Sequence, residues 1–224
     1  MKKSNKYQAD IACCDCIEIL EDGIKGNFRN VVKNRTIKVI DEYVEDYIKK
    51  EEFYGAVVWG KIIKKELLTD IHFENIKYGE DTKYMYNIFL TNPVTRLNVY
   101  KGYYYMRNKD SITYSKRENE IKIYLDRIYA GEAVYGCALE CKNKELLKKV
   151  IECYEQRIYI SIVEMIKENS YEEYIENYKI LCKHILKLEN NFSKKALLFK
   201  FFKCFPYSYW KFFRLYYRIR YRIK

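Results

Sequence analysis

Apolar and polar residues recur in regular patterns along most of the chain, and these patterns predict its elements. Residues 9–20 are rich in isoleucine and cysteine and end at a Glu-Asp-Gly turn signal, which predicts a strand. Apolar residues at helical spacing predict a helix over 36–50, begun by Thr36, and another over 81–90. The stretch 95–108 is dense in aromatic and β-branched residues and predicts extended chain.

From residue 118 onward the pattern is helical almost without interruption. Breaks at Cys-Lys-Asn-Lys-Glu and at Asn-Ser-Tyr-Glu-Glu divide the stretch 118–188 into three predicted helices. Ser170, followed by two glutamates, is typical of a helix start. We therefore expect an α/β protein with a sheet-containing part over 1–115, a helical part over 116–192 and a basic aromatic tail over 193–224.

The net charge of +11 is concentrated in this tail (residues 193–224). No acidic residue follows Glu189, whereas ten lysines and arginines do, interleaved with twelve aromatic residues. Pro206 divides the tail. Beyond it a narrow arc of a helical wheel holds Lys211, Arg214, Arg218 and Arg222, and Arg220 falls among the apolar residues opposite. Such a helix fits an anionic membrane surface, with rings among the acyl chains and cations against the headgroups.

Two alternatives remain for the tail. It can pack on the body as a helix with a solvated basic face, or bind single-stranded nucleic acid, which cations and aromatics also suit. We favour the membrane over nucleic acid, because the body has no basic surplus. The first ten residues lack the apolar core of a signal peptide, and no apolar run approaches the ~20 residues that span a bilayer. We therefore expect a cytoplasmic protein, peripheral at the inner face of the cell membrane.

Eight cysteines and two histidines raise the question of a metal site. Cys13 and Cys16 have the spacing of a ligand pair, but on a strand their side chains point to opposite faces. There is no second such pair, and His72 and His184 stand alone. We expect the cysteines to be small core residues and the histidines to be structural or exposed.

Glu80 and Asp81 follow Gly79 at the start of the helix predicted over 81–90. Acids in a first helical turn satisfy free N–H groups and interact favourably with the positive end of the helix dipole. Taken alone, the pair needs no other explanation. The surrounding sequence offers a second one.

The stretch 56–115 resembles the acceptor-side half of bacterial family 2 glycosyltransferases. Those enzymes carry Trp-x-Lys-Leu-Tyr-Lys-Arg-Glu-Leu-Leu, then a Phe, a Glu-Asp that opens a helix, and a tyrosine-rich strand ending in Ser-Ile-Thr. The matching residues, in order, are Trp59, Lys61, Glu66, Leu67, Leu68, Phe73, Glu80, Asp81, Phe89, Tyr103, Tyr104, Tyr105, Ser111, Ile112 and Thr113. The resemblance covers about residues 7–115 and implies a partial GT-A-like (nucleotide-diphospho-sugar transferase) sheet with helices.

The resemblance implies an inverting transfer in which Asp81 is the catalytic base. It takes the proton of an acceptor hydroxyl as that oxygen attacks the anomeric carbon of a nucleotide sugar. A carboxylate suits this task because it is ionised at neutral pH and can hydrogen-bond the hydroxyl. The substrate-binding residues that the resemblance implies are Glu80, Trp59, Lys61, Arg107 and Ser111.

Ordinary interpretations stand beside these roles, since Trp59 can be a core tryptophan and Lys61 an exposed stem. Family members also begin with a nucleotide-binding half whose Asp-x-Asp holds Mg²⁺ or Mn²⁺ and the sugar diphosphate, and residues 1–60 contain no such spacing. We therefore expect a protein that transfers sugar to a glycan or lipid-linked acceptor only feebly alone, and that works with a separate nucleotide-binding half. The alternative is a non-catalytic module that docks on membranes or on a partner.

Overall fold

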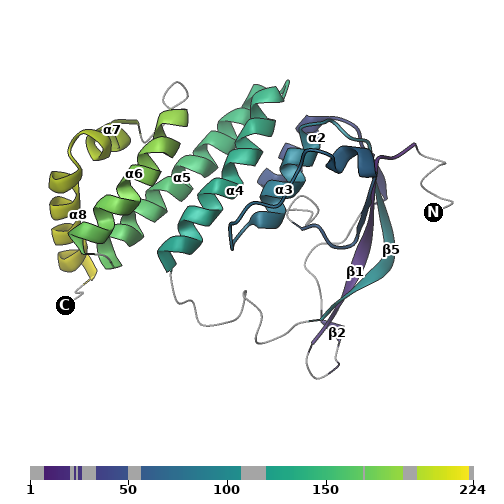
Figure 1. The fold of residues 1–224 in the computed structure, drawn as a ribbon, viewed down its shortest axis with the longest axis horizontal. Helices are drawn as coiled ribbons and strands as arrows, with labels where there is room; N and C mark the ends of the chain where they lie inside the picture. Colours follow the sequence, from purple (N-terminus) through teal and green to yellow (C-terminus); the bar gives the residue numbers. More distant parts are fainter. Residues whose placement is uncertain are drawn as a thin grey trace.

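The structure is a computed structural model of the chain, with the sheet at one end and helices stacked toward the other (Figure 1). It describes residues 8–20, 23, 25–26, 34–49, 57–106, 120–168, 170–188 and 196–221.

A five-stranded mixed sheet forms the N-terminal end. Its centre is the parallel pair of β1 (Ile11–Ile19) and β5 (Thr95–Met106). The strands β2 (Lys25–Gly26) and β4 (Lys61–Ile63) pair antiparallel with β1, and β3 (Arg35–Ile37) pairs antiparallel with β5. The strand predicted over 9–20 and the extended chain predicted over 95–108 are confirmed.

Two helices lie between the sheet and the rest of the molecule, α2 (Ile40–Lys49) and α3 (Glu80–Phe89). Their apolar faces share one core with the sheet: Tyr43 and Tyr86 are buried together with Leu97 of β5. The Tyr43 hydroxyl is also 2.5 Å from the Thr95 hydroxyl, which joins α2 to the start of β5.

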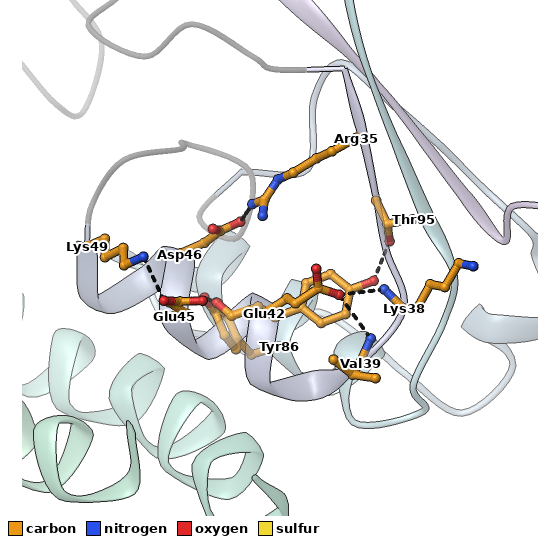
Figure 2. Close-up of polar contacts among 10 residues, drawn as sticks. Arg35, Lys38, Val39, Glu42, Glu45, Asp46, Lys49, Tyr86 and Thr95 are labelled. Carbon is orange, nitrogen blue, oxygen red and sulfur yellow. Dashed lines mark hydrogen bonds and ion pairs between the residues drawn. The ribbon is translucent and has the colours of Figure 1, made fainter. Parts of the chain in front are cut away.

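The start of α2 differs from the prediction, because Thr36 does not cap it. Thr36 lies within β3, and the helix begins at Ile40. The free N–H groups before it are satisfied from inside the first turn instead: the Glu42 carboxylate accepts from the N–H of Lys38 at 2.9 Å and of Val39 at 3.4 Å. Figure 2 shows this arrangement together with the ion pair within α2, Glu45–Lys49, and the one between α2 and β3, Asp46–Arg35.

Three long helices continue the stack away from the sheet (Figure 1). They are α4 (Glu120–Glu140), α5 (Lys144–Glu168) and α6 (Tyr171–Leu188). The three predicted helices and their breaks are therefore confirmed. Ser170 begins α6 as its sequence predicts, since its hydroxyl accepts from the Glu173 N–H while the Glu173 carboxylate accepts from the Ser170 N–H, both at 3.4 Å.

The tail forms two helices at the end farthest from the sheet, α7 (Ala196–Cys204) and α8 (Pro206–Tyr221). Pro206 divides them, as predicted. One apolar core runs through the molecule, from Ile11 on β1 to Tyr209 on α8. Among the described residues, no helix combines the length and the apolar character that a membrane crossing requires.

Candidate functional site

The loop that leads into α3 is fixed by the long helix beside it. The Asp126 carboxylate of α4 is buried and accepts from the backbone N–H groups of Lys77 at 2.9 Å and Tyr78 at 3.2 Å. On the other side, the Phe73 and Tyr84 rings stack with centroids 4.1 Å apart. These contacts set where α3 begins.

Gly79 makes the turn into α3 and cannot be replaced by a larger residue without strain. Its φ is 87°, in the left-handed region, and a Cβ atom there would lie 2.8 Å from the Cβ atom of Ala130 on α4. Gly79 occupies the position just before the helix, and it has no side chain with which to cap the helix. The first two side chains of α3 are those of Glu80 and Asp81.

The Asp81 carboxylate extends away from its own helix toward the segment before β4. Its Oδ2 atom accepts from the backbone N–H of Val58 at 3.3 Å. The ordinary explanation of the pair, a capping contact within α3, therefore does not describe this carboxylate. Because it sits in the first helical turn, it still benefits from the helix dipole.

The segment that Asp81 contacts is a tight turn over residues 57–60. The Lys61 ammonium donates to the carbonyl of Val57, and the Cys14 N–H of β1 donates to the carbonyl of Gly60 at 2.9 Å. Gly60 has a φ of 67°, so the turn needs glycine at this place. With the Asp81 contact, three separate side-chain or backbone groups hold the turn that carries Trp59.

Trp59 lies on the sheet rather than in the central core. Its ring stacks on Tyr103 of β5 with centroids 4.9 Å apart and planes 11° apart, and it tilts against Tyr105 at 5.5 Å. The indole is partly exposed and is not among the buried residues of the main apolar core. Lys61 is not an exposed stem: its side chain is partly buried and its ammonium is bonded.

Burial raises the pKa of the two acids in this cluster and lowers the pKa of the lysine. It raises the pKa of Asp81 above its usual value, although the Val58 N–H and the Lys61 charge oppose this. Burial likewise raises the pKa of Glu80, although hydrogen bonds from the N–H groups of Glu80 and Gly79 oppose the rise and repulsion from Asp81 and Asp126 adds to it. Burial lowers the pKa of Lys61. Asp81 is thus a carboxylate with raised proton affinity beside a lysine.

Asp81 also differs from the other aspartates that accept a backbone N–H in the described part of the chain. The shortest such bonds of Asp10, Asp15, Asp41 and Asp126 measure 2.7, 2.8, 2.8 and 2.9 Å. The Asp81 bond is longer, at 3.3 Å, and the Val58 N–H is the one donor that its carboxylate has among the described residues. Those four act as firm clamps on the backbone, whereas Asp81 is weakly engaged.

The cysteines and histidines do not gather into a site. Within the described ranges no three His, Cys, Asp or Glu side chains converge as metal ligands would. Burial raises the pKa of the Cys13 thiol to about 11, which disfavours the thiolate that a metal requires. His184 is buried against Glu132 at 2.6 Å, and His72 is exposed, as expected of structural and surface residues.

The structure thus brings together four of the six predicted site residues, Trp59, Lys61, Glu80 and Asp81. Arg107 and Ser111 lie outside the described residues. Sequence reasoning missed Asp126, which positions the loop before α3. It matched Tyr103 and Tyr105 to the family but did not predict that their rings support Trp59. A signal for Asp126 was present, since an acid between Leu125 and Ile128 on an apolar helix requires a specific partner.

Comparison with known proteins leaves this geometry as the main evidence on function. No family model matches the chain, and no curated protein sequence is significantly similar to it.

Proposed function

We propose that the chain is the acceptor-side part of a GT-A-like inverting glycosyltransferase of family 2 type, with Asp81 as its catalytic base. The observation that carries this proposal is the weakly engaged, half-buried Asp81 carboxylate beside the turn of Trp59 and Lys61. A base must have a proton affinity near that demanded by its reaction, and burial moves Asp81 in that direction. Mounted on a helix start, it is held by rigid backbone.

The proposed step is a single displacement. The hydroxyl oxygen of the acceptor forms a bond to the anomeric carbon of the nucleotide sugar, and the bond from that carbon to the diphosphate breaks. The nucleoside diphosphate leaves with the electron pair, and the hydroxyl proton passes to Asp81. Because attack and departure occur on opposite faces, the configuration at the anomeric carbon inverts.

In this proposal Trp59 and Glu80 bind the acceptor, and Lys61 supports the base. The Trp59 indole, supported by Tyr103, presents a flat apolar surface for a sugar ring, and Glu80 accepts from a second hydroxyl or orients the first. Lys61 lies near the Asp81 charge and helps to keep the base ionised before substrate binds.

A divalent cation, Mg²⁺ or Mn²⁺, is expected for the family, but the described residues do not fit one. No three potential ligands converge among them, so we derive no step through a metal. The proposal concerns the acceptor side, and it requires a nucleotide-binding half to supply the donor.

A second candidate function is favoured by the hydrogen bonds themselves. Asp81 and Lys61 both tie the 57–60 turn to its surroundings, as residues of a non-catalytic module would. The two functions differ in what asparagine can do at position 81. Its side-chain oxygen accepts the Val58 N–H as well as a carboxylate does, but it takes no proton.

Acceptor binding is measured first, by tryptophan fluorescence. The chain has two tryptophans, so Trp210→Phe leaves Trp59 as the sole reporter. Titration with a panel of hexose and N-acetylhexosamine oligosaccharides is expected to give a saturable change in emission for the acceptor class. Trp59→Phe in the native chain should weaken binding of that glycan in calorimetry. A flat response across the panel contradicts the acceptor role.

Catalysis is measured next, with a separately expressed nucleotide-binding half and a labelled nucleotide sugar. Asp81→Asn is expected to lower the transfer rate by about 10²–10⁴-fold while glycan affinity stays unchanged. Lys65→Gln, an exposed residue shortly after β4, is the matched control and should retain the rate. If Asp81→Asn transfers sugar as fast as the wild type, Asp81 only holds the 57–60 turn in place and is not the base.

A further inference from the structure

The tail is anchored to the body along one side. Phe199, Phe202 and Tyr209 are fully buried. The rings of Phe202 and Tyr209 pack edge to face, with their centroids 5.2 Å apart. Where Pro206 divides α7 from α8, two hydroxyls of α6 donate to backbone carbonyls: Tyr178 to Lys203 at 2.5 Å and Tyr174 to Pro206 at 3.1 Å. The α7–α8 pair is therefore a fixed part of the fold, as the alternative of a packed helix predicts.

The opposite side of the same helices is apolar and exposed. On α8, Phe212 is 61%, Leu215 60% and Ile219 72% exposed, and Tyr216 is exposed beside them. In a helix these positions follow one another at intervals of three and four, so they form a continuous stripe. The large exposed residues of α7 and the junction are Leu197, Phe201 and Phe205. We call these seven residues the outer face.

Cations border the outer face, and no acid interrupts it. Lys211 and Arg218 are exposed on the flank of the α8 stripe, and Arg220 lies on its other flank. Arg214 stacks over the Trp210 ring at 4.7 Å, close to the body. The tail contains ten lysines and arginines and no aspartate or glutamate.

We propose that the outer face of α7–α8 binds the surface of an anionic lipid bilayer. The apolar stripe enters the boundary between headgroups and acyl chains, and the flanking lysines and arginines contact lipid phosphates. This goes beyond the acceptor role of the sheet end, because the tail lies at the opposite end of the molecule (Figure 1). A protein bound this way holds its candidate site away from the membrane contact.

Two other occupants fit the surface less well. Single-stranded nucleic acid stacks its bases on rings, yet Leu197, Leu215 and Ile219 are among the most exposed residues of the face and offer no aromatic surface. A second copy of the chain would bring two cationic flanks together, since a two-fold interface sets the same patch against itself. Anionic lipid accommodates both the aliphatic stripe and the charge.

The test is co-sedimentation of the full chain with vesicles of phosphatidylcholine alone and of phosphatidylcholine mixed equally with phosphatidylglycerol. We expect binding to the mixed vesicles that weakens as salt rises, and little binding to the neutral ones. The triple variant Phe212→Ser, Leu215→Ser, Ile219→Ser should bind at least about tenfold more weakly. Lys211→Gln with Arg218→Gln should lower binding by about 25-fold at low salt, or about fivefold per cation.

The matched control removes exposed apolar residues elsewhere. Leu139→Ser with Leu186→Ser changes two side chains of similar exposure on α4 and α6 and should bind as the wild type does. Circular dichroism checks that every variant folds, and sedimentation velocity measures self-association. Equal binding to both vesicle types, full binding by the triple variant, tighter binding to single-stranded DNA at matched salt, or a dimer that the triple variant abolishes each overturns the proposal.

Discussion

The two ends of the molecule are organised by different interactions. At the sheet end, single carboxylates place the backbone: Asp10 accepts from Val94 at 2.7 Å, and Asp126 accepts from Lys77 at 2.9 Å. At the tail end there is no acid, and buried rings such as Phe202 hold the helices in place. The sheet end therefore depends on a few exact polar contacts, and the tail depends on apolar burial along one face.

This difference explains where chemistry and attachment can reside. At the sheet end, aspartates such as Asp10 and Asp126 form short hydrogen bonds to the backbone. Asp81 differs from them because its one such bond among the described residues is long, which leaves its carboxylate more available to a substrate. A surface for lipid needs exposed apolar area on a rigid support, and the tail supplies it because its buried side fixes the exposed one. Each end has the interactions that its proposed role requires.

The largest loss of stability is expected from a substitution where the tail packs on the body. Phe202→Ala should lower the free energy of unfolding by about 3–5 kcal/mol, because it opens a cavity at a fully buried ring. Phe212→Ala, on the exposed side of α8, should change it by less than about 0.5 kcal/mol. Urea denaturation measures both. Equal losses would mean that the tail has no distinct buried and outer sides.

At the sheet end, the next effect is expected at the turn into α3. Gly79→Ala should cost about 2–4 kcal/mol, since alanine combines left-handed strain with a clash against Ala130. Gly23→Ala is the matched control: its φ of 79° carries the same strain, but nothing lies within 4 Å of a Cβ atom there, so about 1 kcal/mol is expected. Equal losses in urea denaturation would remove the close approach of α4 as a cause.

Much of the helical half could be predicted from sequence, because its signals are local. Apolar periodicity marks α4, α5 and α6, and the capping residue Ser170 lies one position before α6. The short strand β3 could not be predicted in this way. Arg35 and Ile37 are extended because they pair with Leu97 and Thr95, some sixty residues along the chain, so helical spacing alone wrongly moved the start of α2 back to Thr36.

Four of the six predicted site residues lie near one another in the structure, but the contacts that they make could not be predicted from the sequence. Local sequence places Glu80 and Asp81 at a helix start, where capping is the usual outcome. That Asp81 instead meets Val58 depends on the pairing of β4 with β1, which brings the 57–60 turn close to α3. The GT-A-like fold and the transferase activity stay predictions, since no comparison tests them.

A smaller loss of stability is expected when the Asp126 carboxylate, which fixes the loop before α3, is removed. Asp126→Ala should lower stability by about 2 kcal/mol, because it leaves the N–H groups of Lys77 and Tyr78 without their acceptor. Asp126→Asn keeps one acceptor oxygen and should cost about half as much. Hydrogen exchange at the two amides measures the local consequence. Unchanged protection in Asp126→Ala would show that the loop is held by other contacts.

The N-terminal cap of α6 measures what an exposed hydrogen bond contributes to the stability of the helical half. Ser170→Ala should lower stability by about 1 kcal/mol, because the Glu173 N–H loses its acceptor. Ser208→Ala, an exposed position within α8, is the control and should change it by less than about 0.5 kcal/mol. Thermal unfolding followed by circular dichroism distinguishes the two. If Ser170→Ala unfolds at the wild-type temperature, packing alone defines the start of α6.

The smallest effect, and the most specific, concerns the pH dependence of stability at Asp81. Its folded pKa is raised above the usual 3.8, so the folded state holds the proton more tightly than the unfolded state does. The stability that this proton contributes is fully present below 3.8 and is lost as pH rises through the raised value. Asp81→Asn does not titrate, so its free energy of unfolding, measured by urea denaturation, should fall less than that of the wild type as pH rises from acid to neutral.

At the same end of the molecule, Asp10 should make stability depend on pH in the opposite direction. The Lys64 ammonium and the Val94 N–H hold the pKa of Asp10 below 3.8, so its stability is present above that value and lost as pH falls through the lowered one. Asp10→Asn should therefore be less stable than the wild type at neutral pH, with the difference shrinking toward acid. If Asp81→Asn behaved in the same way, Asp81 would be a clamp like Asp10, and its raised proton affinity would no longer support the role of a base.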